Sequence, residues 1–186
     1  MSYLPDYPIV TPRLRLRPFT RGDVDAVHEY RCREDVALYL FDPPLSREEC
    51  ALAIHQRVLQ TEFHQEGDKI VLAVEEVERA RLVGEMSLVW RSADARQGEI
   101  GWIFHPMHQG RGYATEAARA LLALGFEGAG LHRIFARCDA RNTSSWRLME
   151  RLGMRREAHF REHALFKGEW DEEFIYALLH REWRTE

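Results

Sequence analysis

The chain has 186 residues, of which 45% are hydrophobic and 30% charged, and its formal net charge at pH 7 is −4. This length and composition allow one substantial hydrophobic core and are too small for two ordinary domains, so residues 1–186 are predicted to form a single domain. The negative charge argues against a protein that binds nucleic acid by neutralising phosphates, and it suits a cationic partner better.

The three cysteines, Cys32, Cys50 and Cys138, are an odd number at irregular spacing. This spacing indicates neither a disulfide framework nor a zinc site, and we expect no metal cofactor. The N-terminal stretch lacks the apolar run of a signal peptide or a membrane span. We therefore expect a cytoplasmic protein with no membrane partner.

The first third of the chain predicts one strand and two helices. Charged and apolar residues alternate over 13–17, which is the period of a half-buried strand. Two capping boxes follow, Thr20 with Asp23 and Ser46 with Glu49, and each predicts the start of a helix. The predicted elements are a strand over 13–17, a helix over 21–33, a proline-containing loop over 39–45 and a helix over 46–65.

The remainder predicts a mixed α+β domain. Three short apolar or alternating runs, 70–74, 82–90 and 99–104, indicate an antiparallel meander. A helical pattern after Pro106 ends near Gly128, and with the strand that follows it forms a β-helix-β crossover. The predicted elements after this helix are a strand over 132–139, a helix over 142–152 and strands over 154–166 and 170–179.

The link between the strand ending at Phe104 and the next helix contains Gly110 and Gly112. Backbone N–H groups at a helix start have no intrahelical partner and lie at the positive end of the helix dipole. Glycine has no Cβ, so an anion such as phosphate can approach the main chain and the turn can adopt positive φ. The pattern predicts an anion site at this turn.

Three interpretations of the turn compete. A P-loop would end in Gly-Lys-Ser or Gly-Lys-Thr, which is absent. A dinucleotide fingerprint would have Gly or Ala where Thr115 stands and would follow a parallel sheet, although Asp139 at the end of the next strand keeps this interpretation open. The simplest alternative is a helix that merely begins after a glycine turn.

Residues 105–117 resemble the acetyl-CoA signature of the GNAT superfamily, Gln/Arg-x-x-Gly-x-Gly/Ala, with Gln109, Gly112 and Ala114 matching in order. Residues 142–154 are similar to the later motif of that superfamily, in which an Asn opens a helix closed by Leu-Gly-Met. The segments 11–17 and 167–171 resemble the Rim-type branch, the ribosomal-protein N-terminal acetyltransferases and their relatives. The resemblance covers nearly the whole chain.

The resemblance implies the GNAT acyl-CoA N-acyltransferase fold, with a mixed, mostly antiparallel sheet of about six or seven strands, about four helices and splayed central strands. It implies acetyl-CoA as co-substrate, with the pantetheine arm along Ile103 and Phe104 and with Asn142 and Ser145 beside the coenzyme. Arg111, Arg119 and Arg147 are further candidates for phosphate contacts. The pyrophosphate would be held by backbone N–H groups of Gln109, Gly110, Arg111, Gly112, Tyr113, Ala114 and Thr115.

The implied reaction is direct attack of a neutral amine on the thioester. Glu99, on the strand leading to the coenzyme, is the leading candidate for the base, and Glu85 is the second. Many members of the superfamily place a tyrosine near the leaving thiolate where this chain has Met149, so the usual acid is absent. Ser145 is the candidate to hydrogen-bond the sulfur.

A protein N-terminal α-amine is the leading acceptor. Its pKa of about 7.8 makes the neutral form accessible at a cost of about 0.5 kcal/mol near neutral pH, against roughly 4 kcal/mol for a lysine side chain. A small amine, such as a polyamine, an amino sugar or an amino-acid derivative, is the alternative acceptor. A non-catalytic acyl-CoA sensor is a second class of hypothesis, and either a monomer or a homodimer is expected.

Overall fold

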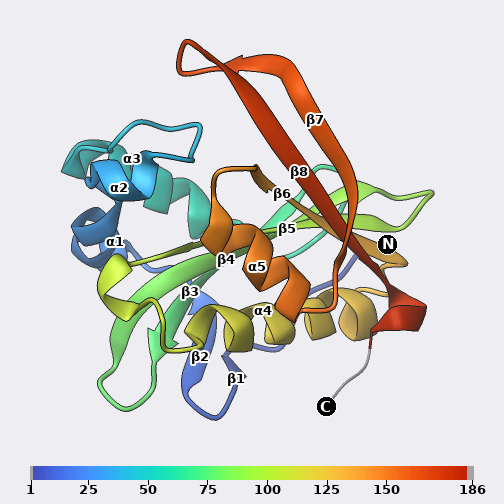
Figure 1. The fold of residues 1–186 in the computed structure, drawn as a ribbon. Helices are drawn as coiled ribbons and strands as arrows, with labels where there is room; N and C mark the ends of the chain where they lie inside the picture. Colours follow the sequence, from blue (N-terminus) through green and yellow to red (C-terminus); the bar gives the residue numbers. More distant parts are fainter. Residues whose placement is uncertain (1, 184–186) are drawn as a thin grey trace.

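The computed structural model describes residues 2–183. One mixed sheet with the strand order β1-β2-β3-β4-β5-β6-β8-β7 runs through these residues, and helices cover both of its faces (Figure 1). The strands are β1 (Ile9–Val10), β2 (Leu14–Pro18), β3 (Lys69–Glu76), β4 (Arg81–Ser92), β5 (Gln97–Phe104), β6 (Arg133–Asp139), β7 (Arg155–Phe166) and β8 (Glu169–Leu179). The α-helices are α1 (Val24–Arg31), α2 (Glu34–Ala37), α3 (Arg47–Arg57), α4 (Tyr113–Ala123) and α5 (Thr143–Arg151).

The sheet separates two apolar clusters, and β3 shows why its sequence is a continuous apolar run. Ile70 and Leu72 pack into the larger cluster with α4 and α5, whereas Val71 and Ala73 pack into the smaller cluster with α1 and α3. Successive side chains of a strand point to opposite faces, so a strand covered on both sides is apolar throughout. This arrangement places α4, which follows the glycine turn, on the same face of the sheet as α5.

The predicted meander and crossover are confirmed. The pairs β3–β4 and β4–β5 are antiparallel, and β5, α4 and β6 form a parallel crossover. The parallel pairing of β5 with β6 extends only from Gln97 to Glu99, opposite residues 133–135. Beyond Glu99 the two strands separate, so the predicted splay of the central strands is present.

Both predicted capping boxes are confirmed. The backbone N–H of Ser46 donates to Glu49 Oε2 at 2.7 Å and the N–H of Glu49 donates to Ser46 Oγ at 3.2 Å. In the other box the carboxylate of Asp23 accepts from the N–H of Thr20 at 2.7 Å. These local bonds begin α3 and the α1 region where the sequence places them.

The second helix was predicted too long, to residue 65, and it ends at Arg57. The residues after it bond to other segments: the carbonyl of Gln60 accepts from the N–H of Val71 at 2.8 Å, and Phe63 pairs with Tyr3. Phe63 is 2% exposed and belongs to the cluster on the opposite face of the sheet from α3, so the chain has to leave the helix to bury it. The structure also adds two short elements, β1 and α2, that carry too few residues to show a period.

Candidate active site

The glycine turn leads directly into α4, as the sequence predicts. Gly110 and Gly112 have φ values of +75° and +79°, which favour glycine, and Gly112 is the N-cap of α4 without a side-chain hydrogen bond. The first N–H groups of α4 are therefore left for an external acceptor. A cavity of about 730 Å³ opens at this helix start.

The cavity brings together most of the predicted coenzyme residues. Arg111 is the exception, because it is exposed and does not line the cavity, although its carbonyl helps to shape the turn. Arg147 also borders the cavity. The predicted residues that line it are Ile103, Phe104, Gln109, Gly110, Gly112, Tyr113, Ala114, Thr115, Asn142 and Ser145.

The end of β5 is tied to the turn and is open on its other edge. Gln109 Nε2 donates to the carbonyl of Phe104 at 3.2 Å, which links the signature glutamine to the strand end. Because β5 leaves β6 after Glu99, the edge of β5 that faces β6 has no strand beside it over residues 100–104, within the part of the chain that the structure describes. This unpaired edge can accept an extended ligand that hydrogen-bonds as an added strand would.

A second cavity, of about 280 Å³, lies across the splay from the first. Val71 in its wall belongs to the cluster with α1 and α3, whereas Tyr113 and Leu148 in the wall of the first cavity belong to the cluster with α4 and α5. The two cavities therefore approach the sheet from opposite faces. They meet at six shared residues, which are Tyr39, Leu40, Trp102, Ile103, Asn142 and Ser145.

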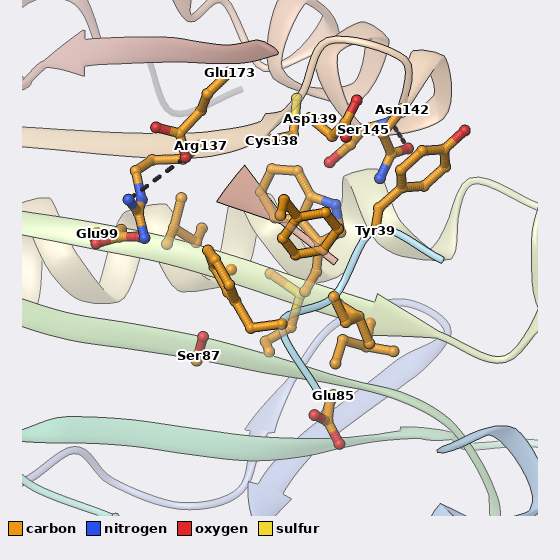
Figure 2. A pocket seen from close by; sticks show the side chains of 18 of the residues that line it. Tyr39, Glu85, Ser87, Glu99, Arg137, Cys138, Asp139, Asn142, Ser145 and Glu173 are labelled. Carbon is orange, nitrogen blue, oxygen red and sulfur yellow. Dashed lines mark hydrogen bonds and ion pairs between the residues drawn. The ribbon is translucent and has the colours of Figure 1, made fainter. Parts of the chain in front are cut away.

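The two predicted base candidates both line the second cavity and both are paired with arginine. Glu99 Oε2 accepts from Arg91 Nε at 2.6 Å and Oε1 accepts from Arg137 Nε at 3.1 Å. Glu85 is 5% exposed, and its Oε2 accepts from Tyr30 and from Arg57, each at 2.7 Å. In the lining of this cavity, Glu99 lies beside Arg137, whereas Glu85 lies apart from both (Figure 2).

The structure adds Arg137 and Glu173, which the sequence analysis did not single out. Arg137 lies between Glu99 and Glu173, and its Nη1 is 3.5 Å from Glu173 Oε1 (Figure 2). Burial raises the pKa of Glu173, and the neighbouring carboxylates of Asp171 and Glu99 raise it further against the opposing effect of Arg137. No local motif marks these residues, because β6 and β8 become neighbours only through long-range pairing.

Asn142 and Ser145 lie at the junction of the two cavities. Asn142 is the N-cap of α5, and its Oδ1 accepts from the N–H of Ser145 at 3.2 Å, as expected of an N-cap asparagine. Met149 is fully buried in the core, so no side chain reaches the junction from that position. Tyr39, from the loop after α2, lines both cavities, and its ring lies beside Asn142 (Figure 2).

The splayed strands, the glycine turn at a helix start and the second cavity across the splay are the features of an acyl-CoA-dependent N-acyltransferase. A family model described as an acetyltransferase (GNAT) domain matches residues 13–155. The chain belongs to the GNAT acetyltransferase family, and it is an acetyl-CoA-dependent N-acetyltransferase.

Relatives cover nearly the full chain. An uncharacterized N-acetyltransferase from Bacillus subtilis, YnaD, is 34% identical over 94% of this chain and 98% of its own length. The crystal structure of a GNAT-family acetyltransferase from Bacillus anthracis superposes with a TM-score of 0.84 at 33% identity, covering 98% of this chain and all of that one.

More distant relatives differ in their acceptors. A spermidine N(1)-acetyltransferase from Vibrio cholerae is 24% identical over 86% of this chain and 89% of its own length. A [ribosomal protein uS5]-alanine N-acetyltransferase from Escherichia coli is also 24% identical, over 98% of this chain and 95% of its own. Only the second of these names is of the Rim type, and at 24% identity it does not place this chain in that branch. Within residues 2–183, no helix is long and apolar enough to span a membrane, and no group of three or more side chains is placed to hold a metal.

Proposed function

We propose that this enzyme acetylates the N-terminal α-amine of a protein, by direct attack of the amine on acetyl-CoA in a ternary complex. The observation that carries the proposal is the pair of cavities that meet at the splay between β5 and β6. A donor in the larger cavity and an acceptor in the smaller one would face each other at Ile103, Asn142 and Ser145. No covalent intermediate on the enzyme is needed, because both reactants reach the junction together.

The donor would bind through main-chain groups. The N–H groups of residues 109–115 would hold the pyrophosphate at the start of α4, where the helix dipole favours negative charge. The pantetheine arm would run along the open edge of Ile103 and Phe104, and the thioester would then lie at the junction. Asn142 and Ser145 would contact the coenzyme near its sulfur.

In the reaction, the amine nitrogen attacks the thioester carbonyl carbon, the C–S bond breaks and coenzyme A leaves as a thiolate. The proton lost by nitrogen would go to a carboxylate of the acceptor cavity, directly or through water. Glu99 remains our first candidate, because it lies on the strand that leads to the junction. Glu85 stays the second candidate, and Glu173 is a third, because its raised pKa makes its carboxylate a better proton acceptor. Ser145 would donate a hydrogen bond to the departing sulfur.

The acceptor cavity suits the narrow end of a larger molecule. It is small, and Phe41 and Phe166 border it where the β7–β8 hairpin meets α2 and the loop after α2; there Lys167 Nζ donates to the carbonyl of Ala37 at 2.6 Å. The terminal residue of a protein would enter while the rest of its chain stays outside. The low cost of deprotonating an α-amine favours the same acceptor.

A second acceptor class, a small polycationic amine, is favoured by the charge of the cavity. Arg137 is the single basic side chain among the described residues that line it. Carboxylates attract a cation and disfavour an anionic acceptor. The five carboxylates in the lining are those of Glu85, Glu99, Asp139, Asp171 and Glu173.

Mass spectrometry of acetyl transfer to a panel of amines tests the proposal. The panel contains peptides with free N-termini, the same peptides with blocked N-termini but a free lysine, and spermidine. We expect acetylation of free N-termini with no product on the blocked peptides. Product on spermidine alone would transfer the assignment to small polycations. Tight acetyl-CoA binding with no product on any amine would support the sensor alternative instead.

A further inference from the structure

We infer that Arg13 and Glu116 form a clamp that holds the glycine turn in the conformation that binds the coenzyme, which makes Arg13 a positioning residue for acetyl-CoA. The inference rests on the proposed function, because it requires that the turn over residues 109–115 holds the pyrophosphate. It also gives a role to the Arg-rich N-terminal segment, which neither cavity includes.

Glu116, in the first turn of α4, accepts hydrogen bonds from the segment that precedes β2. Its Oε1 accepts from Thr11 Oγ1 at 2.6 Å and from the backbone N–H of Arg13 at 2.9 Å, and its Oε2 accepts from Arg13 Nε at 2.7 Å. These two segments are 103 residues apart in the chain, counted from Arg13 to Glu116. Burial alone would raise the pKa of Glu116, but the bonds from Thr11 and Arg13 outweigh burial and lower it, so the carboxylate stays ionised.

The same guanidinium reaches the turn itself. Arg13 Nη1 donates to the carbonyl of Arg111 at 2.9 Å. In a trans peptide the carbonyl and the next N–H point in opposite directions, so this bond directs the N–H of Gly112 away from Arg13. Gly112 lines the coenzyme cavity, which makes its N–H one of the groups available to a phosphate. Arg13 thus orients the N–H of Gly112, a hydrogen-bond donor that belongs to another residue.

A further contact anchors the turn to the same end of the sheet. The hydroxyl of Tyr113 donates to the buried carboxylate of Glu76 at the end of β3, and Glu76 is paired with Leu14, the residue after Arg13. The guanidinium of Arg13 also lies 5.0 Å from the centre of the Tyr113 ring. The turn is therefore fixed to β2 and β3 on both sides of Gly112.

The clamp matters because the turn contains two glycines, which have more conformational freedom to lose than other residues. If the turn were loose, coenzyme binding would have to order it, and that free energy would be subtracted from the affinity. The side chain of Arg13 is 49% exposed, so the ion pair itself adds little to global stability. Its loss should therefore lower affinity for the coenzyme while the protein stays folded.

The test compares two donors in Arg13→Ala: acetyl-CoA, and S-acetyl-pantetheine, which lacks the pyrophosphate. Loss of a charge-assisted hydrogen bond that orders the turn should weaken acetyl-CoA binding by about tenfold or more, with kcat at saturating donor nearly unchanged. The kcat/KM for S-acetyl-pantetheine should stay at the wild-type value. Calorimetry gives the acetyl-CoA affinity without any acceptor amine.

Arg15→Ala is the matched control, because Arg15 lies two residues along and pairs with Glu75 at 3.1 Å, away from the turn. It should bind acetyl-CoA as the wild type does. Arg13→Lys should recover only part of the affinity, because an ammonium cannot bond Glu116 and the Arg111 carbonyl with a planar fork. Adding Glu116→Gln to Arg13→Ala should weaken binding little further.

Wild-type acetyl-CoA affinity in folded Arg13→Ala would overturn the clamp and leave the proposed function intact. Equal losses of kcat/KM with both donors would also overturn it, because they would indicate general damage instead of a loosened phosphate turn. A wild-type enzyme that did not bind acetyl-CoA would refute the proposed function first.

Discussion

Glu99 and Glu173 are the same residue type beside the same guanidinium, yet their surroundings differ. Both oxygens of Glu99 accept from arginines, whereas Glu173 is half-buried near two other carboxylates and has a raised pKa. A carboxylate held by two arginines is well placed to fix Arg137 in the cavity. A carboxylate with a raised pKa is a stronger base, provided that it is deprotonated.

Glu99→Gln should slow turnover by about tenfold to a hundredfold while leaving acetyl-CoA affinity unchanged, because general-base removal affects the chemical step. The loss should be largest at low pH, where free amine is scarce. The measurement is kcat against pH for both proteins.

Glu173→Gln is the matched comparison, because Glu173 pairs with Arg137 as Glu99 does. If Glu173 is the base, its raised pKa places the acidic limb of the wild-type profile at higher pH than an ordinary glutamate would. The limb would then disappear in Glu173→Gln and persist in Glu99→Gln. Equal rates for Glu99→Gln and wild type at every pH would remove Glu99 from the reaction.

At the level of elements, the β7–β8 hairpin borders the smaller cavity, the proposed acceptor site, although it extends away from the core (Figure 1). Lys167 and Gly168 form its tight turn with φ values of +51° and +84°, the conformation of a two-residue hairpin loop. Besides the Lys167 bond to Ala37, the rings of Phe166 and Phe41 meet edge to face at 5.5 Å. These contacts join the hairpin to α2 and the loop after it, and both phenylalanines line the smaller cavity.

Lys167→Asn should raise the KM for the acceptor amine several-fold without changing acetyl-CoA affinity. Asparagine tolerates positive φ, so the turn should keep its shape while the bond to Ala37 is lost. Lys69→Asn is the control, because Lys69 is an exposed lysine that lines neither cavity. Steady-state kinetics with the best acceptor measures both. An unchanged acceptor KM would show that the hairpin contact does not shape the site.

The elements show which structural features a sequence can predict. The capping boxes, the meander and the glycine turn are predicted from local signals in the sequence. Each of them lies where it was predicted. The end of α3 depended on burying Phe63 across the sheet, and the bond from Lys167 to Ala37 joins residues 130 apart. Arg137 and Glu173 likewise meet only because β6 pairs with β8. Contacts of this kind depend on tertiary packing, which no local pattern encodes.

At the scale of the whole molecule, function depends on one sheet that is covered on both faces and opened in the middle. The parallel pairing of β5 and β6 stops after three residue pairs, and the opening joins a cavity on one face to a cavity on the other. Residues of α4 and α5 line the larger cavity, whereas the loop after α2 and the β7–β8 hairpin border the smaller one. Donor and acceptor can therefore reach one junction without sharing an entrance.

We propose that the turn over residues 109–115 binds the pyrophosphate of acetyl-CoA, and the two cavities are assigned to donor and acceptor on that basis. Gly112→Glu places a side chain and a negative charge where the phosphates would lie, and its Cβ would meet Arg13 Nη2 at 3.3 Å. Gly67→Glu is the control for backbone strain, since Gly67 has a φ of +95° and open space around its Cβ position.

Calorimetric titration with acetyl-CoA measures both variants against the wild type, with circular dichroism to confirm that each is folded. We predict binding to the wild type and to Gly67→Glu and no measurable binding to Gly112→Glu. Unchanged acetyl-CoA affinity in folded Gly112→Glu would contradict the account.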